Sequence, residues 1–233
     1  MTNVNNEPSK DKDYYGELYE GVDILKEIIK KYKKMENIEI ELRLGQIEDY
    51  SFNSGLGSLG FFNKIKDVLD KSKSWDKIVN NNSEELINNG IRRMTSFCNK
   101  KIMRHSCIKK HKIESVDFYY TGTPYDIRIG VAKEIPVEDK IKTGLIRKKE
   151  RTSYFYNDYR IDLTKVIQIE NTVESILFEL EVEFINLTND VSDIYRAHSG
   201  LLLIRDIINM CEKIESDAKL TKKEKTITKS MEL

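Results

Sequence analysis

Apolar and polar residues alternate in several segments of the chain, and this period of two predicts β-strands. The pattern is clearest in Ile38–Leu44 (IEIELRL) and in Phe178–Phe184 (FELEVEF). Because side chains at i and i+2 share one face of a strand, each segment has an apolar face and a charged face. Further strands are predicted within residues 91–137 and near residues 145–156, 159–169 and 175–187.

Other segments have the spacing of helices or the composition of loops. Helical spacing predicts a helix from Tyr14 to about Met35, a short helix from near Ser58 and a final helix from Asn189. Residues 51–60 are rich in Gly and Ser and predict a loop, and the polar, Asn-rich residues 75–90 predict a loop or short helices. Many strands without a β-α-β rhythm indicate a mainly β (α+β) fold, an antiparallel sheet or barrel with helices packed outside it.

Domain boundaries follow from composition. Residues 1–12 are polar and are expected to be a disordered N-terminus. Residues 13–216 are expected to form a single domain, and the Lys/Glu/Thr-rich residues 217–233 are expected to be a tail that links to a following domain.

The overall charge excludes one general mode of binding. The chain has 39 basic and 39 acidic residues, so binding to nucleic acid through a large net charge is not indicated, and phosphate binding would need local separation of charge. The three cysteines have no C-x-x-C spacing, and three histidines make a histidine zinc site improbable. No apolar span or signal peptide is recognisable, so an intracellular protein without a membrane partner is expected.

Carboxylates line the charged faces of the two clearest strands. These are Glu39 and Glu41, with Arg43, in the first strand, and Glu179, Glu181 and Glu183 in the second. A solvated outer face is the simpler interpretation. If both faces point into a barrel instead, the cluster suits a divalent cation, because Mg²⁺ and Mn²⁺ prefer carboxylate oxygens.

Cations follow the same alternation between these two strands. One strand has Arg147, Lys149 and Arg151 on one face, and the next has Arg160, Asp162 and Thr164. They form either an outer face with cross-strand salt bridges or an inward phosphate clamp. Asp126, Arg128 and Glu134 share a face of an earlier strand, and the pairs Arg92/Arg93 and Lys110/Lys112 leave open which member points inward.

Together these motifs resemble a known family. In the order Glu39-x-Glu41-x-Arg43, Arg147-x-Lys149-x-Arg151-x-Ser153-Tyr154, Arg160-Ile161-Asp162-Leu163-Thr164 and Glu179-x-Glu181-x-Glu183, they resemble the metal-dependent RNA 5′-triphosphatases of the triphosphate tunnel metalloenzyme superfamily. These enzymes occur in fungal, protozoan and large-DNA-virus capping systems. The resemblance covers about residues 36 to 187. The Lys-, Asn- and Ile-rich composition resembles a giant virus of the mimivirus type, in which such a domain begins a capping enzyme.

The resemblance implies a fold, a cofactor and roles for individual residues. The fold would be an eight-stranded antiparallel β-barrel tunnel with helices packed outside, and the cofactor Mg²⁺ or Mn²⁺. The metal would be held by Glu39, Glu41, Glu179, Glu181 and Glu183. Substrate would be bound by Arg43, Arg128, Arg147, Lys149, Arg151 and Arg160. The catalytic set would comprise Glu39, Glu41, Arg147, Lys149, Arg151, Arg160, Asp162, Thr164 and Glu181, with Asp162 and Thr164 supporting the cations.

The implied activity is removal of the γ-phosphate from triphosphate-ended RNA, the first step of cap formation, together with hydrolysis of free nucleoside triphosphates (NTPs). The resemblance also implies a monomer fused to a guanylyltransferase domain, located in a cytoplasmic viral factory or a virion if the source is a virus. Two alternatives stay open. One is a related tunnel enzyme acting on thiamine triphosphate, polyphosphate or ATP, although that branch typically has Lys where this chain has Arg43. The other is a non-catalytic β-barrel that binds RNA ends or an acidic partner.

Overall fold

The computed structural model describes residues 10–98, 101–120 and 123–230, and within these ranges the side chains of residues 20–97, 101–120 and 123–211. The order of elements is α1 (Lys10–Tyr32), β1 (Ile38–Glu48), β2 (Ser51–Ser54), α2 (Leu59–Lys71), β3 (Lys77–Asn88), β4 (Ile91–Cys98), β5 (Lys101–Phe118), β6 (Asp126–Pro136), β7 (Leu145–Tyr156), β8 (Tyr159–Glu170), β9 (Val173–Phe184) and α3 (Asp193–Ser230).

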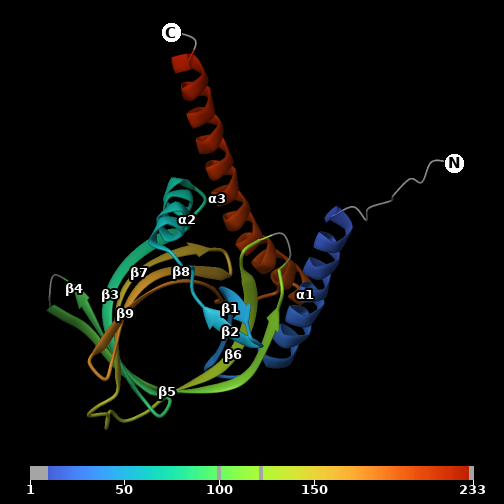
Figure 1. Cartoon of the computed structure of the whole chain (residues 1–233). Helices are drawn as coiled ribbons and strands as arrows, with labels where there is room; N and C mark the ends of the chain where they lie inside the picture. The colour runs from blue at the N-terminus through green and yellow to red at the C-terminus, as the bar shows by residue number, and fades with distance from the viewer. Residues whose placement is uncertain (1–9, 99–100, 121–122, 231–233) are drawn as a thin grey trace.

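Eight antiparallel strands close into a barrel, as the family resemblance implied. The strand order is β1-β6-β5-β4-β3-β7-β8-β9, and β1 pairs with β9 to close the ring, while β2 adds to the edge of β1. Figure 1 shows this ring end-on, with the helices outside it. No helix in the described part of the chain combines the length and apolar character needed to cross a membrane.

The hydrophobic core lies between the outer barrel wall and the helices. It joins apolar residues of α1, α2 and α3, such as Ile29, Ile65 and Ile204, to outward residues of β1 and β9, such as Leu42 and Val182. The apolar faces recognised in the sequence therefore point outward, and the charged faces of the same strands point into the barrel. This arrangement follows from the side-chain period of two in a strand.

The segment 75–90 corrects the sequence-based expectation of a loop or short helices. It forms β3, which pairs along its length with β7 and over its second half with β4. Its first half has no apolar stripe, because one face borders the polar interior and the other faces solvent. The ladder with β7 holds the whole strand and the ladder with β4 holds its second half, and backbone hydrogen bonds of this kind leave no hydrophobic pattern in the sequence.

Smaller differences concern the ends of elements. Ser51–Ser54 of the predicted loop form β2, and α2 begins where expected, with Ser58 accepting a hydrogen bond from the Phe61 amide. Residues 10–12 of the predicted disordered segment begin α1, whereas residues 1–9 lie outside the described residues. Helix α3 continues through the predicted tail to Ser230.

Candidate active site

The barrel encloses a polar cavity of about 720 Å³. Its wall is formed by inward side chains of eight strands, which alternate with core-facing or solvent-facing neighbours. Strand register fixes which charges meet: Glu41 lies opposite Glu183 and Arg43 opposite Glu181 where β1 closes on β9. All five predicted metal ligands line the cavity, and so do Arg43, Arg147, Lys149, Arg151 and Arg160.

Every cation of the β7 row has a carboxylate partner on a different strand. Arg147 Nη2 donates to Glu179 Oε1 at 2.7 Å, and Lys149 Nζ donates to Glu85 Oε1 at 2.7 Å. Arg151 Nη1 donates to Asp162 Oδ2 at 2.7 Å. The row is thus held in place on the inner wall before any substrate binds.

Asp162 and Thr164 accept hydrogen bonds from Arg151 but do not line the cavity themselves. Both are fully or almost fully buried. Thr164 Oγ1 accepts a hydrogen bond from Arg151 Nε at 3.1 Å, and Asp162 also accepts from Ser153 Oγ at 2.6 Å and Arg160 Nε at 3.1 Å. Asp162 therefore holds the guanidinium groups of Arg151 and Arg160, and Thr164 holds that of Arg151, whereas the catalytic role that the resemblance implies for both stays a prediction.

Negative charge is in excess where β1 meets β9. Burial and the nearby Glu181 carboxylate raise the pKa of Glu41 to about 7, although Arg43 opposes the change. Burial, Glu39 and Asp162 raise the pKa of Glu183 to about 7, although its ion-pair partner Arg160 lowers it. Two carboxyl groups that retain protons near neutrality mark a place where an added cation would be stabilised.

Glu181 has the opposite behaviour. Burial alone would raise its pKa, but Arg43 and Arg151 outweigh burial and lower the pKa to about 2. Arg43 Nε lies 3.0 Å from Glu181 Oε1, and Arg151 Nη2 lies 3.6 Å from Glu181 Oε2. Glu181 is therefore ionised at any working pH and links the carboxylate cluster to the cation row.

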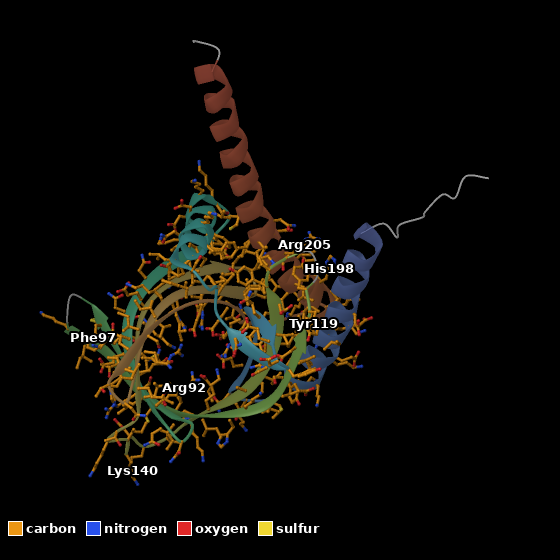
Figure 2. All side chains as sticks on the ribbon, in the orientation of Figure 1. Arg92, Phe97, Tyr119, Lys140, His198 and Arg205 are labelled. Atoms are coloured by element: carbon orange, nitrogen blue, oxygen red, sulfur yellow. The ribbon has the colours of Figure 1, made fainter. Side chains whose placement is uncertain are left out.

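The structure settles which members of the ambiguous pairs point inward. Arg92 lines the cavity (Figure 2). Arg93, the next residue of the strand, is not part of the lining and donates to the Ile141 carbonyl at 3.1 Å. Lys110 also lines the cavity and is paired with Glu39, and Lys112 is not part of the lining. Among the described residues, Arg92 has no carboxylate within ion-pair distance, so its guanidinium is available to an anion.

Arg128 corrects the predicted set of substrate-binding residues, because the structure does not bring it to the cavity. Its guanidinium is held by Asp117 at 2.5 and 2.7 Å and lies 4.5 Å from the centre of the Phe52 ring. Phe52 packs against the inward side of Gly45, where a Cβ would come within 2.6 Å of the ring. This packing covers β1 beyond Arg43 and separates Arg128 from the cavity.

Sequence reasoning missed Glu85, the buried partner of Lys149. Glu85 lies in β3, the polar segment that was expected to be a loop, so it carried no strand pattern. Burial would raise its pKa, but Lys149 reverses the shift and lowers it. Burial and the neighbouring Arg151 lower the pKa of Lys149.

Comparison with known proteins agrees with the fold and the cavity. The family model described as "mRNA capping enzyme, beta chain" matches residues 62–203, which is more than half of the chain. The chain belongs to this family. Two relatives are mRNA-capping enzyme beta subunits: that of Schizosaccharomyces pombe is 32% identical over 102 residues, and that of Yarrowia lipolytica is 37% identical over 78 residues. The alignments cover 41% and 33% of this chain, but 33% and 19% of the relatives.

Solved structures show the same fold. The S. pombe Pct1 RNA triphosphatase in complex with the Spt5 CTD superposes with a TM-score of 0.68 over 80% of this chain and 91% of that chain, at 19% identity. The mimivirus capping enzyme triphosphatase superposes with a TM-score of 0.55 over 82% of this chain and 97% of that chain, also at 19% identity. At this identity the likeness concerns the fold, and the chemistry has to be argued from the cavity.

The donor set of this family member fits a divalent metal, although the ligands are not preassembled. Glu39, Glu41 and Glu183 offer oxygen donors, and burial together with neighbouring carboxylates raises the pKa of the last two. Within the described side chains, no group of three carboxylate, His or Cys side chains is arranged to hold an ion. Glu39 and Glu41 are instead turned to Lys110 and Arg43, so a metal would have to compete with these ion pairs.

Proposed function

We propose that this chain is an RNA 5′-triphosphatase, which hydrolyses the γ-phosphate of triphosphate-ended RNA and leaves the diphosphate end needed for cap formation. One observation carries the proposal: the cation row of β7 and the carboxylates of β1 and β9 line the same cavity inside the barrel. Phosphoryl transfer requires mainly positioning and charge stabilisation, and this wall supplies both. Free NTPs should also be substrates, because the expected contacts are to phosphate.

The cations would hold the triphosphate. Arg147, Lys149 and Arg151 share the inward face of β7 at intervals of two residues, so that their head groups can contact different oxygens of one triphosphate. Arginine offers a planar pair of donors to phosphate oxygens. Arg92 contributes a further guanidinium without an internal partner, so its interaction with phosphate needs no ion pair to be broken.

We propose Mg²⁺ or Mn²⁺ as the cofactor, held by Glu39, Glu41 and Glu183 with Glu179 and Glu181 nearby. When bound, the ion would neutralise charge on the γ-phosphate as the bond to the bridging oxygen breaks. The side chains of the cavity would provide the other contributions to the reaction. Cations would stabilise the transferring group, Asp162 and Thr164 would fix the direction of Arg151, and a cavity glutamate would orient the attacking water.

The test is release of γ-phosphate from triphosphate-ended RNA and from ATP, with Mg²⁺, with Mn²⁺ and with EDTA. Metal-dependent release should be abolished in Glu39→Ala and Glu181→Ala. Glu150→Ala is a matched control, because Glu150 lies on β7 between Lys149 and Arg151 but is exposed on the outer wall. A preference for polyphosphate over RNA would support a related tunnel phosphohydrolase instead, and phosphate binding without any release would support a non-catalytic barrel.

We also propose a monomer that works beside a linked guanylyltransferase domain. Both points rest on the family resemblance. Light scattering of the purified full polypeptide would test the first, and formation of a covalent guanylate adduct on that polypeptide would test the second.

A further inference from the structure

The cavity changes character along its length. Its inner part, at Arg43, Arg147 and Glu179, is lined by charged side chains. Its other part reaches the strand ends at the start of β3 and the end of β7, where Asn81, Phe155 and the ion-paired Arg160 form part of the lining. A triphosphate needs the charged part, so the other part is free to hold the nucleoside to which the triphosphate is attached.

Phe155 is the one aromatic residue among the described residues that line the cavity. Its inward direction follows from the alternation of β7, since Arg151 and Ser153 precede it on the same face. The ring is partly exposed and is not part of the hydrophobic core. Lys77 Nζ lies 5.8 Å from the ring centre, which leaves a half-open aromatic surface beside a cation.

Two polar side chains at this end have no partner of their own. Asn81 on β3 and Arg104 on β5 both line the cavity, and neither forms a hydrogen bond or an ion pair with any described residue. In contrast, Arg43, Lys110, Arg160 and the three cations of the β7 row are each paired with a carboxylate. These three groups suit a nucleotide. A guanidinium binds phosphate, an amide hydrogen-bonds to the edge of a base, and an aromatic ring stacks on its face.

We infer that this end of the cavity is a subsite for the 5′-terminal nucleotide of the RNA, so that the substrate enters with its γ-phosphate leading. The base stacks on Phe155, the Asn81 amide hydrogen-bonds to its edge or ribose, and Arg104 contacts the first phosphodiester. The inference rests on the proposed triphosphatase function and adds the direction of the chain within the cavity. Stacking accepts any base, so this subsite selects RNA ends over bare polyphosphate without reading sequence.

The test compares ligands with and without a nucleoside. Dissociation constants for triphosphate-ended RNA and for inorganic tripolyphosphate are measured in EDTA, with fluorescein-labelled RNA and by competition. Phe155→Ala should weaken RNA binding about tenfold and leave tripolyphosphate unchanged, because base stacking is lost and phosphate contacts are kept. Phe155→Trp should restore binding. Tyr156→Ala is the matched control, since Tyr156 lies on the opposite face of the same strand and contacts Trp75.

Arg104→Ala separates the phosphodiester contact from the base contact. It should weaken a triphosphate-ended dinucleotide but not a mononucleoside triphosphate. Equal weakening of RNA and tripolyphosphate by Phe155→Ala, or no change in either, would overturn the inference. Binding is measured without turnover, so these outcomes do not depend on the triphosphatase assay. In that assay, an inactive wild-type protein would overturn the proposed function.

Discussion

The ion pair between Glu85 and Lys149 allows stability and activity to be separated. The two side chains are 8% and 6% exposed, their charged atoms are 2.7 Å apart, and Glu85 Oε2 has no hydrogen-bond partner in the described structure. Glu85→Leu should lower the free energy of unfolding by about 3 kcal/mol, because removal of one member of a buried pair leaves an uncompensated charge. We place the cost at the lower end of the usual range, since burial already lowers the pKa of Lys149 and the orphaned amine can lose its proton.

The double variant Glu85→Leu/Lys149→Met should recover most of this loss. Apolar side chains of similar volume remove both desolvation costs, and such replacements are often neutral or stabilising. The double variant should therefore unfold at a urea concentration close to that of the wild type. It should still be inactive, because Lys149 no longer contributes positive charge to the triphosphate.

Urea denaturation of the two single variants and the double variant gives the coupling energy directly. Glu84→Leu is the control, because Glu84 precedes Glu85 on the exposed outer face and should shift stability by no more than about 0.5 kcal/mol. Two results would refute the reasoning: a cost below about 1 kcal/mol for Glu85→Leu, or a double variant whose cost equals the sum of the single costs.

Three further predictions concern other charged groups of the barrel and its helices. Arg92→Ala should lower kcat/KM about 100-fold, as expected for a lost charge-assisted contact to phosphate, whereas Arg93→Ala should have little effect. Equal losses in the two variants would contradict the inward assignment of Arg92. In EDTA, the raised pKa values of Glu41 and Glu183 mean that the folded state keeps protons that the unfolded state releases above its ordinary value of 4.5. Their contribution to stability therefore falls as pH rises toward about 7, and Tm should drop over this range less in Glu183→Gln than in the wild type; an equal drop would contradict the assignment. Arg196→Met should lower the free energy of unfolding by about 3 kcal/mol, because it removes a fully buried guanidinium from carbonyl and carboxylate partners. The KM should not change, and a raised KM would show that this contact also shapes the cavity.

The sequence was sufficient for the parts of the site that lie on amphipathic strands. Glu39 and Glu41 alternate with core-facing Ile and Leu, so the period of two placed them on one face, and the resemblance placed that face inside the barrel. The same argument placed Arg147, Lys149 and Arg151, whose inward direction the structure confirms. Their roles in metal and substrate binding stay predictions.

The sequence was insufficient where neither face of a strand is apolar. Strand β3 borders the polar cavity on one side and solvent on the other, so Glu85 and Asn81 had no periodic pattern around them. The expectation that Arg128 reaches the cavity was wrong for a different reason. Its strand and face were correct, but the packing of Phe52 against Gly45 depends on how β2 folds onto β1, and a one-dimensional pattern does not contain that contact.

The most direct test of the central claim is identification of the product formed at the RNA end. RNA labelled at either the γ- or the β-phosphate is incubated with the protein and Mn²⁺ or Mg²⁺, and the products are resolved by thin-layer chromatography. The account predicts that the γ-label appears as orthophosphate while the β-label stays on diphosphate-ended RNA. With EDTA, or with the Glu39→Ala variant, neither orthophosphate nor diphosphate-ended RNA should form. Release of the β-label as pyrophosphate, or retention of the γ-label under every metal condition by folded protein, would contradict it.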